Sequence, residues 1–291
     1  MEQHVLLCSV NLATGKKGET MKIFLDSADL DEIRQFYAWG LADGITTNPS
    51  LLRKAVEKRK KVNMKQYLNE ILTIARRTPV SLEVTTFTAR EMVEEGKKLY
   101  RLFNPVAKNV YIKIPVNPAF KSEDKTHFDG IAAIRALSKA KIPVNCTLIF
   151  TPEQALLAAK AGAKIVSPFA GRIDDYLRTQ HALKFGKSDY YPASGWIDKS
   201  KMWNDNGIIS GIDLVRQIVQ LFRNYGIKAE VLAASLRNPR QVREAALVGA
   251  QIATLPFDVV KDLLKHYKTY EGMQKFTEDV VEEYRELGKR K

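Results

Sequence analysis

From Met21 onward, short runs of apolar and β-branched residues alternate with longer segments in which apolar residues recur every three or four positions. The short runs are typical of buried strands, and the longer segments are typical of amphipathic helices. Eight strands are expected, at Lys22–Asp26, Gly44–Thr47, Val80–Thr85, Val110–Ile114, Pro143–Ile149, Lys164–Ser167, Glu230–Ala234 and Gln251–Thr254. Helices are expected between them, for example at Asp29–Trp39, Met64–Arg77, Ala89–Phe103, Phe128–Ala140, Pro152–Ala161, Gly211–Tyr225 and Pro239–Val248. Eight such alternations predict a single closed (β/α)8 TIM barrel rather than an open doubly wound sheet.

Three parts of the chain depart from this pattern. Residues 1–20 are polar at their end and are expected to be a dispensable N-terminal extension, with residues 21–291 forming one domain. Arg172–Ile209 is long, irregular and rich in Tyr, Trp, Asp, Lys and Gly, and a loop of that length is usually functional. After Phe257 helix is expected to continue to Tyr267. A charged amphipathic helix then follows at Thr277–Leu287, placed to pack across the barrel or against another subunit.

Composition narrows the class of protein further. The chain has 291 residues, enough for one barrel, and a net charge of +13 that favours polyanions or phosphorylated small molecules as ligands. The two cysteines, Cys8 and Cys146, lie far apart and the four histidines are scattered, so neither a disulfide framework nor a metal site is expected. No apolar run is long enough to span a membrane and no signal peptide is evident, so a cytoplasmic enzyme is expected.

The run Asn109–Val116 carries one lysine among apolar residues. Strand alternation places Lys113 on one face with Tyr111 and Pro115. If both faces of the sheet are covered, the Lys113 ammonium lies inside the protein, where burial lowers the pKa of a lysine and a neutral amine forms Schiff bases with carbonyl compounds. The alternative is a lysine at a strand end that extends its ammonium to water.

Polar residues recur at the carboxyl ends of the predicted strands. In a (β/α)8 barrel these ends form one face, and catalytic residues come from several of them. The residues with this placement are Asp26, Thr46, Asn48, Glu83, Thr85, Lys113, Asn145, Thr147, Ser167 and Ser235. Each alone is compatible with a cap or a turn. Their coincidence at one end of the barrel favours a binding or catalytic site.

Several of these residues lie in strings that resemble the transaldolase family. The strings are Ile45–Ser50 (ITTNPS), Tyr111–Pro115 (YIKIP), Asn145–Phe150 (NCTLIF), Ser167–Ile173 (SPFAGRI) and Ala234–Asn238 (ASLRN). The match runs in the correct order from about Lys22 to past Leu255. The resemblance implies an enzyme without metal ion or other cofactor that transfers a dihydroxyacetone unit from a ketose phosphate to an aldose phosphate in the pentose phosphate pathway.

The resemblance also implies roles for single residues. Lys113 would form the Schiff base, and Asp26 would take the proton from the C4 hydroxyl during carbon–carbon cleavage. Glu83 and Thr147, with a water between them, would move protons while the carbinolamine forms and loses water. The substrate-binding positions carried over are Thr46, Asn48, Asn145, Ser167, Phe169, Arg172, Ser235 and Arg237.

Within that set, some residues would bind the hydroxyl groups of the donor sugar and others its phosphate group. Asn48, Asn145 and Ser167 would hold the donor hydroxyls. Arg172, Ser235 and Arg237 would hold the distal phosphate, since guanidinium groups pair with phosphate oxygens. Without the family match, ordinary surface charge would be the preferred reading of both arginines.

Alternatives remain within and outside this family. A branch of it cleaves fructose 6-phosphate without an acceptor and has Gln in place of Glu83 and Tyr in place of Phe169, so transfer is favoured here. A barrel that binds nucleic acid would show clustered basic and aromatic residues, and Lys58–Lys61 is the only dense basic cluster. The expected partners are therefore sugar phosphates rather than nucleic acid or membrane, together with further copies of the chain in a homo-oligomer. The sequence leaves open the preferred substrates and whether Met1 or Met21 is the natural start.

Overall fold

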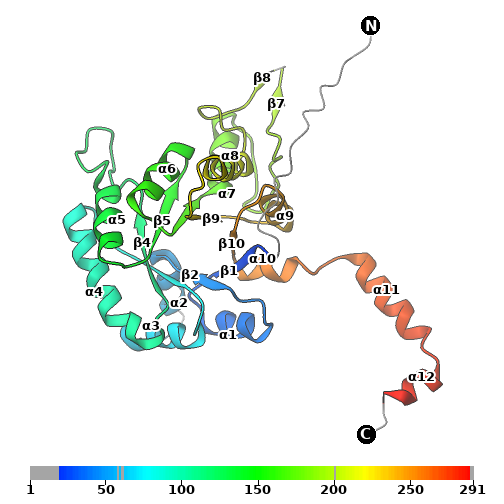
Figure 1. Ribbon diagram of the computed structural model, residues 1–291. Helices are drawn as coiled ribbons and strands as arrows, with labels where there is room; N and C mark the ends of the chain where they lie inside the picture. The colour runs from blue at the N-terminus through cyan, green and yellow to red at the C-terminus, as the bar shows by residue number, and fades with distance from the viewer. Residues whose placement is uncertain (1–19, 58, 60–61, 200, 289–291) are drawn as a thin grey trace.

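The computed structural model describes residues 20–57, 59, 62–199 and 201–288. The predicted extension, apart from its last residue, and most of the Lys58–Lys61 cluster lie outside this range. Eight parallel strands close into a barrel in the order β1-β10-β9-β6-β5-β4-β3-β2 (Figure 1). They are β1 Lys22–Asp26, β2 Gly44–Thr46, β3 Val80–Glu83, β4 Val110–Pro115, β5 Val144–Ile149, β6 Ile165–Pro168, β9 Glu230–Ala233 and β10 Ile252–Leu255. The predicted (β/α)8 barrel is confirmed.

Helices surround the barrel (Figure 1). They are α1 Leu30–Ala38, α2 Pro49–Glu57, α3 Met64–Ile74, α4 Ala89–Ala107, α5 Asp129–Lys139, α6 Pro152–Ala161, α7 Ala170–Gln180, α8 Gly211–Asn224, α9 Pro239–Leu247 and α10 Phe257–Asp262. Side chains fix several of the starts: Thr88 and Thr151 each form a capping box with the residue three positions on, and Asp29 accepts from two amides of α1. Such caps satisfy backbone N–H groups that have no partner in the first turn.

Two apolar layers hold the fold together. The larger lies between barrel and helices, for example Leu25, Ile112 and Val215. The smaller fills the barrel and consists of Phe24, Ile165, Leu232, Ala234 and Ile252. Phe24 needs a glycine opposite it, because a Cβ on Gly44 would come within 2.5 Å of the Phe24 ring. These side chains close the barrel below the polar ends of its strands.

The stretch Arg172–Ile209 is less irregular than predicted. It begins inside the eleven-residue helix α7 and contains a short hairpin, β7 Ile197–Asp198 and β8 Lys201–Met202. The start of this stretch was wrongly predicted to be irregular. The buried face of α7 includes the charged residues Asp174 and Arg178, so apolar residues do not recur regularly along the helix. Residues 181–196 and 203–209 lie outside helices and strands, apart from an isolated bridge between Asp205 and Ile208.

The C-terminal prediction is also corrected. The helix after Phe257 ends at Asp262, and His266 caps a new helix, α11 Tyr267–Glu278, followed by α12 Glu282–Leu287. Neither α11 nor α12 buries a residue, and both extend away from the barrel instead of packing across it (Figure 1). Within the described residues, no helix is long and apolar enough to cross a membrane.

Candidate active site

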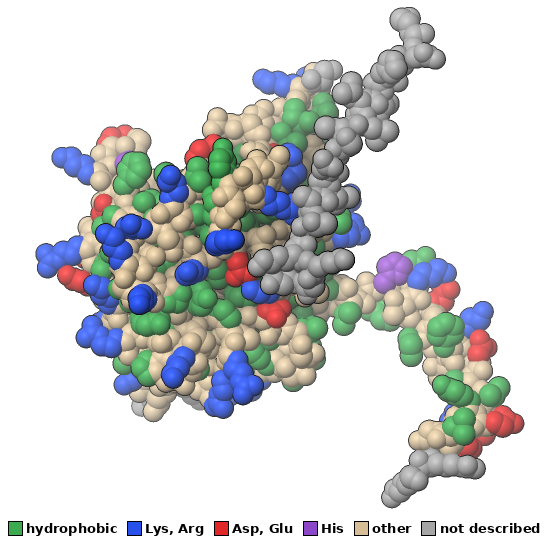
Figure 2. Space-filling model, in the orientation of Figure 1, with side chains coloured by type: hydrophobic (Ala, Val, Ile, Leu, Met, Phe, Trp, Pro, Cys, Tyr) green, Lys and Arg blue, Asp and Glu red, His purple; other side chains and the backbone are tan. Residues whose placement is uncertain are grey.

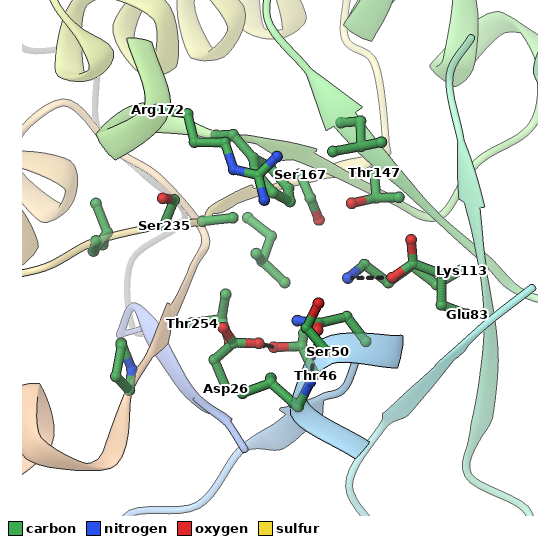
Figure 3. A pocket seen from close by; sticks show the side chains of 18 of the residues that line it. Asp26, Thr46, Ser50, Glu83, Lys113, Thr147, Ser167, Arg172, Ser235 and Thr254 are labelled. Carbon is green, nitrogen blue, oxygen red and sulfur yellow. Dashed lines mark hydrogen bonds and ion pairs between the residues drawn. The ribbon is translucent and has the colours of Figure 1, made fainter. Parts of the chain in front are cut away.

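A cavity of about 550 Å³ lies at the carboxyl ends of the barrel strands. Eleven of the twelve predicted site residues line it: Asp26, Thr46, Asn48, Glu83, Lys113, Thr147, Ser167, Phe169, Arg172, Ser235 and Arg237. Figure 3 labels Asp26, Thr46, Glu83, Lys113, Thr147, Ser167, Arg172 and Ser235 among the side chains that surround this space. Strand parity thus predicted correctly that Asp26, Glu83, Lys113 and Thr147 face one cavity.

Lys113 sits in β4 between Glu83 of β3 and Asn145 of β5 in the strand register. It is 5% exposed, which rules out the alternative of an ammonium reaching water. Its Nζ lies 3.0 Å from Glu83 Oε2 and donates to the Thr47 carbonyl oxygen at 3.2 Å (Figure 3). A buried ammonium requires such acceptors, and the nearer one is also a group that can take its proton.

Thr147 lines the same cavity from β5. Its hydroxyl is buried and has no hydrogen-bond partner in the described part of the chain. A buried hydroxyl is rarely left without a partner unless it serves a ligand or water. Thr147 Oγ1 is therefore available to whatever occupies the cavity near Lys113 and Glu83.

Asp26 lies at the end of β1 and accepts a hydrogen bond from Thr46 Oγ1 at 2.7 Å. The Thr46 hydroxyl has one proton, so Thr254 Oγ1, at 2.5 Å, is the donor to Thr46. Removal of the Asp26 carboxylate from water raises its pKa, and the positive charge of Lys113 offsets part of this rise, followed by the Thr46 hydrogen bond and the charge of Lys187. Asp26 is thus a stronger base than an ordinary aspartate, and it still accepts a hydrogen bond from the Thr46 hydroxyl.

Thr85 lies beyond the end of β3 and does not line the cavity; its hydroxyl donates to Glu95 Oε1 at 3.0 Å. Asn145 is the other predicted strand-end residue that does not line the cavity. Its amide Nδ2 donates to Ser81 Oγ at 3.1 Å, and its Oδ1 accepts from Ser167 Oγ at 2.7 Å. Asn145 is fully buried and orients the Ser167 hydroxyl, which does line the cavity. Asn48 also has a structural bond, because its Oδ1 accepts from Leu51 N at the start of α2.

The other end of the cavity is positively charged. Arg172, at the start of α7, is exposed, and its guanidinium carbon lies 5.0 Å from the ring centroid of Phe169. Phe169 in turn packs against Phe150, with ring centroids 5.9 Å apart. An arginine stacked in this way is held in place while its N–H groups stay free to bind an anion.

Ser235 and Gly171 form a close backbone contact beside Arg172. A Cβ on Gly171 would lie 2.1 Å from the Ser235 carbonyl oxygen and 3.0 Å from Arg237 Nε, so only glycine fits. Ser235 has φ +62°, an uncommon conformation for a residue with a side chain. The glycine of the SPFAGRI string thus lets the loop after β9 approach the start of α7.

Arg237 lines the cavity but is already paired. Its Nη1 and Nη2 each lie 2.5 Å from an oxygen of the Asp175 carboxylate, and Nη1 also donates to the Lys187 carbonyl oxygen at 3.3 Å. Ordinary exposed surface charge is therefore the wrong reading of Arg237, which is mostly buried and held on both sides.

Sequence reasoning missed several residues. Ser50, Lys187 and Thr254 also line the cavity, and Asp175 holds Arg237. Thr254 could have been found, because it shares strand parity with Ile252 at the end of β10. Lys187 and Asp175 carry no such signal, since one lies in a loop and the other on a polar helix.

Known proteins are similar to this chain over most of its length. The family model described as transaldolase/fructose-6-phosphate aldolase matches residues 23–290. A protein of Thermoplasma acidophilum named probable transaldolase is 42% identical over 262 residues, covering 89% of this chain and 95% of that protein. Probable transaldolases of Chlorobium phaeovibrioides and Caldicellulosiruptor saccharolyticus are 40% and 41% identical, each over 89% of this chain and covering 97% and 96% of those proteins.

Proposed function

This chain belongs to the transaldolase/fructose-6-phosphate aldolase family, and we propose that it transfers a dihydroxyacetone unit between sugar phosphates through a Schiff base on Lys113. The observation that carries the proposal is Lys113 itself: a buried lysine, 3.0 Å from Glu83, in a cavity that also contains Asp26. A nucleophilic amine, a group to move its protons and a separate base are what this chemistry requires.

The proposed donors are fructose 6-phosphate and sedoheptulose 7-phosphate, and the acceptors are glyceraldehyde 3-phosphate and erythrose 4-phosphate. This reaction belongs to the pentose phosphate pathway, which would place the protein in the cytoplasm. Phosphorylated sugars suit a cavity with Arg172 and Arg237 at one end. Nucleic acid is not a proposed partner.

The first step joins Lys113 to the ketose. Glu83 takes a proton from the ammonium, and the neutral amine attacks the C2 carbonyl carbon to give a carbinolamine. Glu83 then returns a proton to the carbinolamine hydroxyl, which leaves as water, and a protonated imine remains. The Thr147 hydroxyl, which has no other partner among the described residues, suits a proton-relay position beside Glu83.

The second step breaks the C3–C4 bond. Asp26 takes the proton of the C4 hydroxyl, the C4 oxygen becomes the carbonyl oxygen of the departing aldose, and the bonding electrons pass to the imine nitrogen as an enamine. Burial raises the Asp26 pKa, which strengthens this base. The reverse sequence adds the enamine to the acceptor aldehyde, and water then releases the new ketose.

The remaining residues are assigned to binding. We assign the donor hydroxyls to Ser167, which Asn145 orients, and to the amide nitrogen of Asn48, which has no hydrogen bond among the described residues. Arg172, Ser235 and Arg237 are assigned to the distal phosphate. Thr46 serves Asp26 directly, by donating to its carboxylate.

Transfer is distinguished from simple cleavage by one assay. Release of glyceraldehyde 3-phosphate from fructose 6-phosphate is followed with and without erythrose 4-phosphate. Because water is a poor substitute for the acceptor aldehyde, we expect release only when erythrose 4-phosphate is present. Equal release without it would mean a fructose-6-phosphate aldolase, and no release in either case would contradict both activities.

We further propose that the chain forms a homo-oligomer through α11 and α12. The two helices bury no residue and expose large side chains, among them Tyr270, Met273, Phe276 and Tyr284. Apolar surface of this extent on a projecting segment favours contact with another surface. A second copy of the chain supplies the same segment and completes a symmetric contact.

A further inference from the structure

We propose that Lys187 is the second uncompensated cation of the phosphate end and makes the site selective for phosphorylated sugars. The inference deepens the proposed function and rests on it. Lys187 lies in the loop after α7, well beyond the end of β6 in the sequence, and it lines the same cavity as Arg172 and Lys113.

Hydrogen bonds from other parts of the chain hold the loop that carries Lys187 in position. Three side chains donate to three consecutive carbonyl oxygens: Arg237 Nη1 to Lys187 at 3.3 Å, Asn238 Nδ2 to Ser188 at 3.2 Å, and Arg178 Nη2 to Asp189 at 2.8 Å. The loop also closes on itself, since Gly186 N donates to Asp189 Oδ2 at 2.7 Å and Asp189 N to the Gly186 carbonyl oxygen at 3.1 Å.

These bonds hold the backbone on either side of Lys187. Two of the donors, Arg237 and Asn238, come from the loop after β9 that also provides Ser235. The loop that carries Lys187 is therefore fastened to the phosphate end of the site and not to the outer surface alone. An exposed lysine on an anchored backbone can reach a ligand with less loss of chain entropy than one on a free loop.

The charge of the bound phosphate group also calls for a further cation. A sugar phosphate carries close to two negative charges at neutral pH. Arg172 and Arg237 would supply two positive charges, but the Asp175 carboxylate pairs with both terminal nitrogens of Arg237 and cancels one of them. Only Arg172 then remains to face a dianion, and Lys187 supplies the missing positive charge.

Arg237 has already used most of its hydrogen-bond donors. Its fork toward Asp175 uses one hydrogen of each terminal nitrogen, and Nη1 gives its other hydrogen to the Lys187 carbonyl. Nε and one hydrogen of Nη2 are left for a phosphate, so Arg237 can bind it through this side edge only, with a charge already shared with Asp175. A flexible ammonium with three donors complements this restricted arginine.

Lys187 also acts on the opposite end of the cavity. Its positive charge is one of the influences that lower the pKa of Asp26. The effect on Asp26 is smaller than that of Lys113, so loss of Lys187 is expected to change binding more than the chemistry.

The test replaces Lys187 by Met, which keeps the length of the side chain and removes its charge, and by Arg, which restores the charge. Lys184→Met is the matched control, because Lys184 is exposed in the same loop and does not line the cavity. We expect Lys187→Met to raise the KM for fructose 6-phosphate and the inhibition constant of inorganic phosphate about tenfold or more, the size of one charged hydrogen bond. The kcat should change little, Lys187→Arg should recover most of the loss, and Lys184→Met should behave as the native chain.

A substrate without phosphate separates binding from other effects. Trapping of dihydroxyacetone on the protein by borohydride should proceed equally in the native chain and in Lys187→Met. An equal loss with both substrates, or no change in KM, would refute the role of Lys187. If the native chain traps no sugar at all, the proposed function fails. Calorimetry with inorganic phosphate, native against Lys187→Met, still decides the phosphate site in that case.

Discussion

At the scale of single residues, Lys113 is buried and Asp26 is partly buried, and the two have different neighbours. Lys113 touches a carboxylate and a carbonyl oxygen, so a proton acceptor stands next to the amine. Asp26 accepts a hydrogen bond from a hydroxyl and interacts with Lys113 through the charge of the ammonium, without a hydrogen bond between them. The two halves of the proposed reaction, imine formation and carbon–carbon cleavage, are therefore assigned to different groups.

Replacement of Asp26 by Asn should separate these halves. The amide cannot take the C4 proton, so cleavage should slow by about 10²- to 10⁴-fold, the usual effect of losing a general base. Borohydride trapping of the unbroken ketose adduct should persist. Single-turnover cleavage and trapping are measured side by side, and survival of both at the native rate would mean that another group is the base.

The same residue sets a pH dependence. Asp26 must be ionised to act, and burial raises its pKa above the usual range of an aspartate. In the native chain kcat/KM should therefore fall as the pH drops through this raised value, at a higher pH than for an exposed carboxylate. The residual activity of Asp26→Asn should lack this acidic limb.

Most of the residues that line the cavity could be predicted from the sequence. Strand parity placed Lys113, Glu83, Asp26 and Thr147 in one cavity, because successive side chains of a strand point to opposite faces. It could not distinguish a residue that lines the cavity from one that lies just beneath it, as Asn145 does. Lys187 is brought in by long-range hydrogen bonds that no local pattern reveals.

At the scale of elements, the barrel strands were predicted within about two residues at each end, whereas α7 was missed. Buried strands show as β-branched runs, but α7 buries Asp174 and Arg178 alongside Ile173 and Leu177. Asp174 accepts from Gly211 N at the start of α8 and from Gln241 Nε2 of α9, both at 2.7 Å. One carboxylate thus joins three helices behind the phosphate end.

Asp174 should make stability depend on pH. Burial raises its pKa to about 6, above the unfolded value, so the folded chain binds a proton more tightly. This stabilisation is complete below about pH 4 and is lost as the pH rises through 6, on the order of 2–3 kcal/mol. Between pH 4 and pH 7, the free energy of unfolding of Asp174→Asn, measured with denaturant, should rise by that amount relative to the native chain. A difference that does not change with pH would contradict the assignment.

The contact between α7 and the loop after β9 gives a second test. In Gly171→Ala the new methyl group would overlap the Ser235 carbonyl oxygen, so the loop with Ser235 and Arg237 must move. We expect the KM for sugar phosphates to rise about tenfold or more, since misplaced binding groups are costly. Gly272→Ala is the control, because a Cβ there meets nothing within 4 Å. An unchanged KM in Gly171→Ala would show that the close approach is not needed.

At the scale of the whole molecule, the surface of the barrel differs in chemical character from that of the C-terminal helices. Figure 2 shows Lys and Arg spread over the visible face of the barrel, in keeping with a general positive field of net charge +13. Such a field raises the encounter rate with anionic sugars. The segment of α11 and α12 projects beyond the barrel and shows apolar side chains on its surface (Figure 2).

Truncation tests the proposed assembly. A chain that ends at Lys265 lacks α11 and α12, neither of which buries a residue, so the barrel should still fold. Sedimentation should find an oligomer for the full chain and a smaller species for the truncated one, with similar thermal unfolding of the barrel. A monomeric full chain, or an oligomer that survives truncation unchanged, would contradict assembly through these helices.

The central claim is that Lys113 forms the covalent bond to the substrate. The direct measurement is peptide mass mapping after incubation with fructose 6-phosphate and reduction with borohydride, for the native chain and for Lys113→Met, with thermal unfolding to confirm that the variant is folded. We predict a single modified peptide, which contains Lys113 and carries the reduced dihydroxyacetone unit, and no modification in Lys113→Met. A reduced adduct on another lysine, or one that persists in the folded Lys113→Met chain, would contradict the account.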